Sequence, residues 1–122
     1  MYKRTKQHAH SISHALNGIF WVFKTQPNFQ FHIVVAAIVL LFALFLSIST
    51  IELVMLIMVI FLVIICEMIN TVIEVMIDMG STEWKVQSKI AKDISAGMVL
   101  CSAIASLCVG IIVFVPYLVK YI

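Results

Sequence analysis

Three long apolar runs dominate the pattern of hydrophobic and polar positions along the chain. They cover about residues 31–49, 52–78 and 93–119. An α-helix rises 1.5 Å per residue and needs about 20 apolar residues to cross the hydrocarbon core of a bilayer. The runs therefore predict three transmembrane helices, the second of them longer than one crossing requires.

A fourth segment, about residues 11–26, has a different pattern. Its apolar residues recur at alternating short steps, at Ile12, Ala15, Leu16, Ile19, Phe20 and Phe23. This spacing puts them on one face of an amphipathic helix. Ser11 or Ser13 is a candidate N-cap, and Pro27 is expected to end or bend the helix. We expect this helix to lie in the membrane interface without crossing it.

Composition supports one all-α membrane domain over residues 1–122. Hydrophobic residues make up 63% of the chain and charged residues 11%, whereas soluble domains carry roughly 25% charged residues. A soluble fold of this size would leave much apolar surface exposed to water, and a bilayer removes that problem. The net charge of +2 is too small to suggest a nucleic-acid partner.

Basic residues predict the orientation of the helices. They cluster before the first run and between the second and third, at Lys3, Arg4, Lys6, Lys24, Lys85, Lys89 and Lys92. The connection between the first two runs has none. The positive-inside rule then places the N-terminus and the 80–93 loop in the cytoplasm.

Acidic residues gather at the cytoplasmic end of the second run. Glu67, Asn70, Glu74 and Asp78 follow one another at steps of three, four and four, so they share one face of a helix. Carboxylate and amide oxygens of this kind suit a hard cation such as Mg²⁺. Glu67 lies deepest, where a carboxylate is costly unless it is partnered, and it is the candidate general base. Glu52, by contrast, is expected to be a plain loop charge, as is Glu83.

Cations and small residues follow this acidic stripe. Among the lysines of the 80–93 loop we favour Lys92, which we expect to open the third helix, as a phosphate ligand. Small residues after it would let a polyanion approach the backbone. Acids for Mg²⁺, a lysine for phosphates and a base at membrane depth together indicate phosphoryl transfer to a lipid hydroxyl.

The stripe also resembles a known signature. The segment CEMINTVIEVMID is similar to that of the prokaryotic diacylglycerol kinase and undecaprenol kinase family, through Glu67, Asn70, Thr71, Glu74 and Asp78. The segment KIAKDISAGMVL matches through Lys92, Asp93, Ala96 and Gly97. The segment NGIFWVFKTQPNFQFH matches through Gly18, Lys24, Pro27, Asn28 and His32. The resemblance covers nearly the whole chain, in order and spacing.

The resemblance implies a homotrimer in a bacterial plasma membrane, with ATP- and Mg²⁺-dependent sites shared between neighbouring subunits. By this resemblance Glu67 is the base, Glu74 binds Mg²⁺, and Asn70 positions the reacting groups. Lys92 contacts phosphates and Asp93 holds the nucleotide. His14, Gly18 and Asp78 are further substrate- or nucleotide-binding positions.

One metal-ligand position departs from the family pattern. The family usually has a Glu two residues before the Asn-x-x-x-His element, and this chain has Gln26 there. An amide oxygen can still bind Mg²⁺, but one negative charge is lost. His14 also stands where the family often has Tyr.

These patterns predict a lipid kinase, and we favour undecaprenol as its substrate because the Lys-Asp-x-x-Ala-Gly segment and the proline after the surface helix resemble that branch. One alternative is a diacylglycerol kinase that makes phosphatidic acid. Another is a silent family member that acts as a lipid-binding or scaffold protein, which Gln26 favours. A proton or ion channel built around Glu67 is a third.

Overall fold

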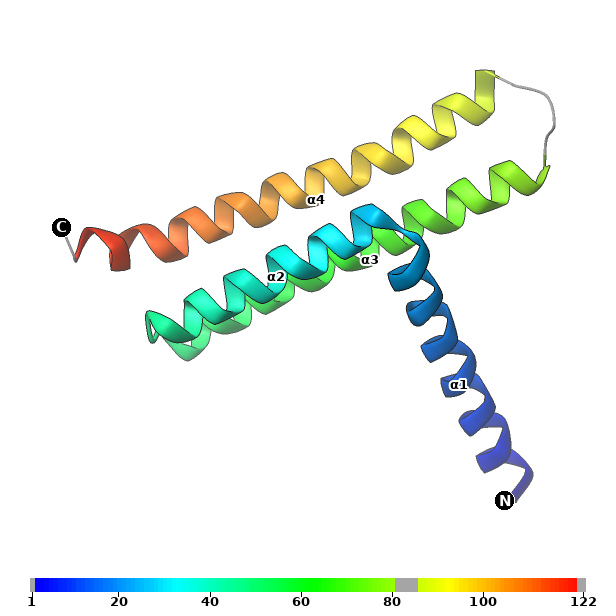
Figure 1. Cartoon of the computed structure of the whole chain (residues 1–122), viewed down its shortest axis with the longest axis horizontal. Coiled ribbons are helices and arrows are strands. Elements are labelled where there is room, and N and C mark those ends of the chain that lie inside the picture. Colours follow the sequence, from blue (N-terminus) through cyan, green and yellow to red (C-terminus); the bar gives the residue numbers. More distant parts are fainter. Residues whose placement is uncertain (1, 81–85, 121–122) are drawn as a thin grey trace.

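The computed structural model describes residues 2–80 and 86–120, and this part of the chain is helical throughout apart from short connections (Figure 1). Its helices are α1 (Tyr2–Thr25), α2 (Pro27–Phe45), α3 (Thr50–Gly80) and α4 (Val86–Val119). The last three are each long and apolar enough to cross a membrane. The predicted all-α class and the three spans are therefore confirmed.

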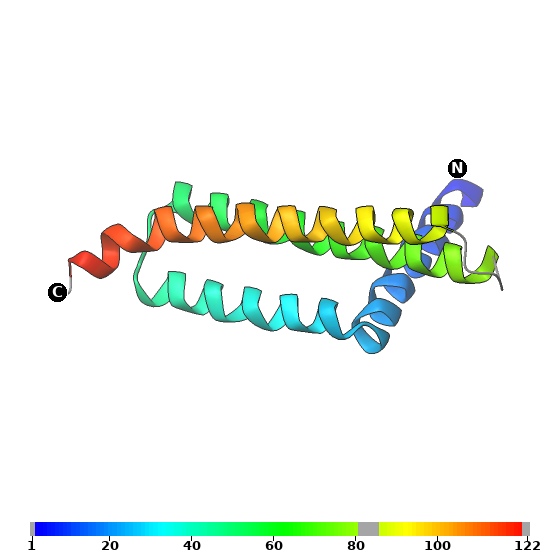
Figure 2. The same cartoon turned by 90° about the horizontal axis from the view of Figure 1, so that it is seen from above.

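Helices α2, α3 and α4 lie side by side with alternating chain direction, and α1 leaves this bundle at a steep angle (Figures 1 and 2). The three spans meet in a small apolar cluster of Ala43, Leu56 and Val113. Only 11% of the most apolar window of α2, and 17% of those of α3 and α4, is buried. Most of the apolar surface is thus left for lipid or for other subunits to cover.

The break between α1 and α2 falls where the sequence predicts it. Pro27 is the first residue of α2, a position that needs no backbone N–H, and Gln26 before it is extended with φ −109° and ψ 105°. The predicted start of the first helix is wrong, however, because α1 begins at Tyr2 and runs through both candidate caps, Ser11 and Ser13. Its early Lys, Arg and Gln residues are good helix formers, although they add nothing to the apolar stripe.

Three span boundaries differ from the predictions by four residues or more. The first span begins at Pro27, not at residue 31. The first span ends at Phe45, not at residue 49, in a Schellman turn with Ser47 at φ 50°. In this turn the Ile48 N–H donates to the Ala43 carbonyl and the Ser47 N–H to the Leu44 carbonyl. Helix α4 begins at Val86, not at residue 93. The apolar run marks only the part inside the membrane, whereas the helix continues into water.

Glu52 is not a plain loop charge, so that prediction is wrong. The residue lies in the first turn of α3, and its carboxylate accepts hydrogen bonds from the Ser49 N–H at 2.9 Å and the Tyr117 hydroxyl at 2.6 Å. The first contact belongs to a capping box, and the second ties the start of α3 to the end of α4. Glu83 lies outside the described residues.

Candidate functional site

The polar stripe of α3 faces α4. Glu67, Asn70 and Thr71 are buried, at 3%, 5% and 3% exposure, and Ser95 of α4 is fully buried. The helical spacing in the sequence predicts that these α3 side chains share one face. Packing against α4 turns that face inward, away from lipid, and this satisfies the expectation that a deep carboxylate must be sheltered.

A short hydrogen-bond chain fixes the orientation of Asn70. The Ser95 hydroxyl lies 2.7 Å from Asn70 Oδ1, and Asn70 Nδ2 donates to Glu74 Oε1 at 3.0 Å. Because the side-chain NH₂ group of Asn70 points at the Glu74 carboxylate, the side-chain oxygen of Asn70 points toward Ser95. The Thr71 hydroxyl donates to the Glu67 carbonyl at 3.0 Å. The two helices therefore hold Asn70 and Glu74 in a defined arrangement.

The exposed end of the stripe carries an ion pair. Lys92 Nζ of α4 lies 2.5 Å from Asp78 Oδ1 of α3, with side chains 34% and 67% exposed. An ion pair as exposed as this adds little to stability. It does keep an ammonium group at the exposed end of the stripe.

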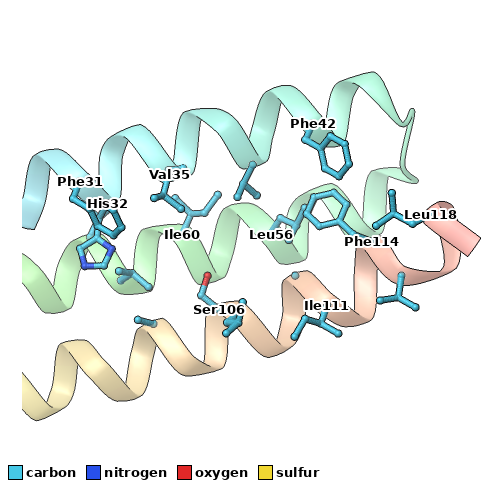
Figure 3. A pocket seen from close by; sticks show the side chains of 18 residues that line it. Phe31, His32, Val35, Phe42, Leu56, Ile60, Ser106, Ile111, Phe114 and Leu118 are labelled. Atoms are coloured by element: carbon cyan, nitrogen blue, oxygen red, sulfur yellow. The ribbon is translucent and has the colours of Figure 1, made fainter.

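An apolar groove of about 500 Å³ lies between the spans, and its lining residues on α3 stop one helical turn before Glu67. It runs between α2 and α4 over α3, from Phe42 and Leu118 at one end to Phe31 and His32 at the other (Figure 3). The His32 imidazole lies within electrostatic range of the Glu67 carboxylate. A long apolar ligand in this groove would thus have one end close to Glu67.

The remaining predicted site residues are not brought to this cluster within one chain. His14 and Gly18 are exposed on α1, which points away from the spans (Figure 1). Gln26 lies at the α1–α2 junction, with its Nε2 3.5 Å from the Thr25 hydroxyl. Asp93 is exposed on α4. Within one chain, the predicted site residues that lie along the α3–α4 cluster are therefore Glu67, Asn70, Glu74, Asp78 and Lys92. His14, Gly18, Gln26 and Asp93 are not part of it.

The donor set of the stripe fits a hard cation. Glu74 uses one of its oxygens to accept from Asn70, and a carboxylate has roughly four acceptor sites. Within residues 2–80 and 86–120, no three His, Cys, Asp or Glu side chains converge closely enough to hold a metal ion. One chain can thus supply part of a Mg²⁺ site, and the other ligands must come from phosphates, water or another subunit.

Two polar residues of the site were missed as functional positions in the sequence. Ser95 has a signal there, because it lies three residues after Lys92 and so shares its face of a helix. For His32, the only signal in the sequence is its position in the segment that resembles the family motif. Its approach to Glu67 depends on how α2 packs on α3, which the sequence pattern does not give.

Replacing Ser95 with Ala is expected to lower kcat about tenfold with little change in KM, because Asn70 is then held by its bond to Glu74 alone. The buried Asn70 oxygen also loses its donor, which costs about 1–3 kcal/mol of stability. Ser102→Ala is the matched control, since that buried hydroxyl bonds only the Val99 carbonyl of its own helix. Steady-state kinetics and thermal unfolding of both variants check this. Equal kcat values for the two would contradict a positioning role for Ser95.

Comparison with known proteins gives a consistent match. Residues 13–114 match the family model described as prokaryotic diacylglycerol kinase. The chain is 34% identical over 108 residues to the undecaprenol kinase of Bacillus subtilis (strain 168), with 88% of each chain covered. It is also 34% identical over 111 residues to the diacylglycerol kinase of Synechocystis sp. (strain ATCC 27184 / PCC 6803 / Kazusa), covering 90% of this chain and 63% of that protein. The matched segment contains the whole α3–α4 cluster.

Proposed function

This chain belongs to the prokaryotic diacylglycerol kinase family and is a lipid kinase of a bacterial membrane, and from that premise we propose that it transfers the γ-phosphoryl group of ATP, with Mg²⁺, to a membrane lipid alcohol. The observation that carries the proposal is the meeting of an apolar groove with a polar cluster. The groove ends at Phe31 and His32, and its lining includes Val63 and Ile64, which lie four and three residues before Glu67 on the same helix. A lipid chain in the groove would present its hydroxyl to the buried carboxylate.

The roles of the α3 and α4 side chains follow from this placement. The Glu67 carboxylate accepts the hydroxyl proton as the lipid oxygen bonds to the γ-phosphorus and the bond to the ADP oxygen breaks. Asn70, oriented by Ser95 and Glu74, positions the reacting groups. Lys92 leaves Asp78 for the phosphates, and Asp93 helps to hold the nucleotide.

Glu74 and Gln26 are the residues we assign to Mg²⁺. The ion would neutralise charge on the phosphate oxygens as the γ-phosphoryl group transfers. Glu74 offers carboxylate oxygens at the end of the hydrogen-bond chain. Gln26 offers an amide oxygen at the α1–α2 junction, a weaker ligand than the family's usual Glu.

We assign the complete site to a homotrimer, with His14, Gly18 and Gln26 coming from a neighbouring subunit. Two features support this. These residues are remote from the α3–α4 cluster within one chain, and most apolar surface of the spans is uncovered. We assign α1 and the 80–93 region to the cytoplasmic side, where ATP is available, because their basic residues favour that side.

For the substrate we favour undecaprenol over diacylglycerol. The relative named undecaprenol kinase matches this chain over nearly the full length of both, whereas the relative named diacylglycerol kinase is the longer protein. In an assay of both lipids in nanodiscs with labelled ATP, we expect kcat/KM for undecaprenol to be higher by about tenfold or more, a difference of about 1.4 kcal/mol. A preference for diacylglycerol would reverse the substrate assignment and leave the kinase assignment standing.

A catalytically silent lipid-binding protein is the second candidate, because Gln26 removes one charge from the metal site. This hypothesis predicts that the protein binds lipid but does not transfer a phosphoryl group to it.

A further inference from the structure

A pair of histidines on α1, one of which (His14) we also assign to the composite kinase site, lies away from the α3–α4 cluster within one chain. His10 and His14 are exposed, lie four residues apart, and bring His10 Nδ1 to 2.9 Å from His14 Nε2, with ring centroids 4.7 Å apart. We propose that these two imidazoles form a binding site for a late first-row divalent metal ion, with Cu²⁺ preferred. This site goes beyond the proposed kinase reaction and does not depend on it.

The separation of the two nitrogens favours this assignment. Imidazole nitrogens bind such metals at about 2.0–2.1 Å, so two of them at right angles on one ion lie about 2.9 Å apart, and two in a tetrahedron about 3.3–3.4 Å apart. The observed 2.9 Å matches the right-angled arrangement. One ring nitrogen now donates its proton to the other. For both nitrogens to bind the ion, the donating imidazole would carry its proton on its other ring nitrogen instead.

Ligand chemistry narrows the choice of ion. Imidazole suits Cu²⁺, Ni²⁺ and Zn²⁺, and affinity at such sites rises to a maximum at Cu²⁺. Right-angled nitrogen and oxygen ligands are typical of tetragonal Cu²⁺ and Ni²⁺. Mg²⁺ prefers oxygen ligands and is not expected here. Because no three His, Cys, Asp or Glu side chains converge in the part of the chain that is described, water completes the coordination.

The position of the pair on α1 makes it accessible from water. The middle of the apolar stripe of α1 consists of Ile12, Ile19 and Phe23. At 100° per residue, the midpoint between His10 and His14 lies about 180° around the helix from it. With that stripe against the membrane, the histidines face the aqueous side. His14 precedes Gln26 by 12 residues, or about 18 Å along a helix, so this site is separate from the proposed Mg²⁺ position.

The test uses the full-length protein in nanodiscs, titrated with Cu²⁺ and followed by electron paramagnetic resonance, which counts bound imidazole nitrogens. We expect one Cu²⁺ per chain with two imidazole ligands. The two-imidazole signal should be lost in His10→Ala and in His14→Ala. It should persist in the matched control His8→Ala, which lies two positions from His10, a separation at which helical residues do not face each other.

Circular dichroism of each variant checks that helicity is unchanged. A wild-type signal from one imidazole or none would overturn the proposal. So would a two-imidazole signal that survives either His10→Ala or His14→Ala, or one that His8→Ala removes.

Discussion

Glu67→Gln is expected to lower kinase turnover by about 10²–10⁴-fold, the usual contribution of a general base. The amide has nearly the same shape as the carboxylate but cannot accept the hydroxyl proton. Since Glu67 is buried at 3% exposure on α3, an isosteric change should leave the packing intact. Transfer of label from ATP to lipid measures the effect, and size-exclusion chromatography checks that the protein still assembles.

Glu52→Gln is the matched control for this experiment. Glu52 lies on the same helix as Glu67 and allows the same Glu-to-Gln change. It is at the opposite end of α3, where its carboxylate accepts hydrogen bonds from Ser49 and Tyr117. It takes no part in the proposed reaction, so turnover should stay within a few-fold of the wild type, although thermal stability can fall. Full activity in Glu67→Gln, or an equal loss in both variants, would contradict the role of Glu67 as the base.

Gln26→Glu is expected to lower the Mg²⁺ concentration for half-maximal velocity by about tenfold, because a charged oxygen ligand gains about 1–2 kcal/mol over a neutral one. The natural chain should show measurable turnover before the change, and its kcat should alter less than its Mg²⁺ requirement. Initial rates over a range of Mg²⁺ concentrations give both quantities.

Gln87→Glu separates metal binding from general electrostatics. Gln87 is exposed in the first turn of α4, so the variant adds the same charge on the same side of the membrane without joining the metal site. Its Mg²⁺ requirement should match the wild type. A rise in Gln26→Glu from no turnover to strong turnover would instead favour a silent natural protein.

The sequence predicts the spans and the inward-facing stripe because both depend on periodicity along one helix. Glu67 and Asn70 share a face by spacing alone, and a deep polar pair has to face another helix. Helix ends are less predictable, because an apolar run shows which residues suit the membrane interior and does not show where the helix begins or ends. Val86, for example, starts α4 in a polar segment.

Contacts between different helices are the part that periodicity cannot give. The bond from Ser95 to Asn70, the approach of His32 to Glu67 and the link between Glu52 and Tyr117 each depend on the rotation and offset of two helices. The groove has the same origin, because its walls come from α2 and α4 and its floor from α3. Spacing within one segment carries no information about such offsets.

We propose that the polar stripe of α3 supports phosphoryl transfer to a membrane lipid. The most direct test of this proposal is the purified protein in nanodiscs with undecaprenol and ATP labelled at the γ-phosphate, with and without Mg²⁺. We predict a labelled lipid phosphate that forms only with Mg²⁺ and disappears in Glu67→Gln. No labelled lipid from undecaprenol or diacylglycerol with Mg²⁺, or the same yield in Glu67→Gln, would contradict it.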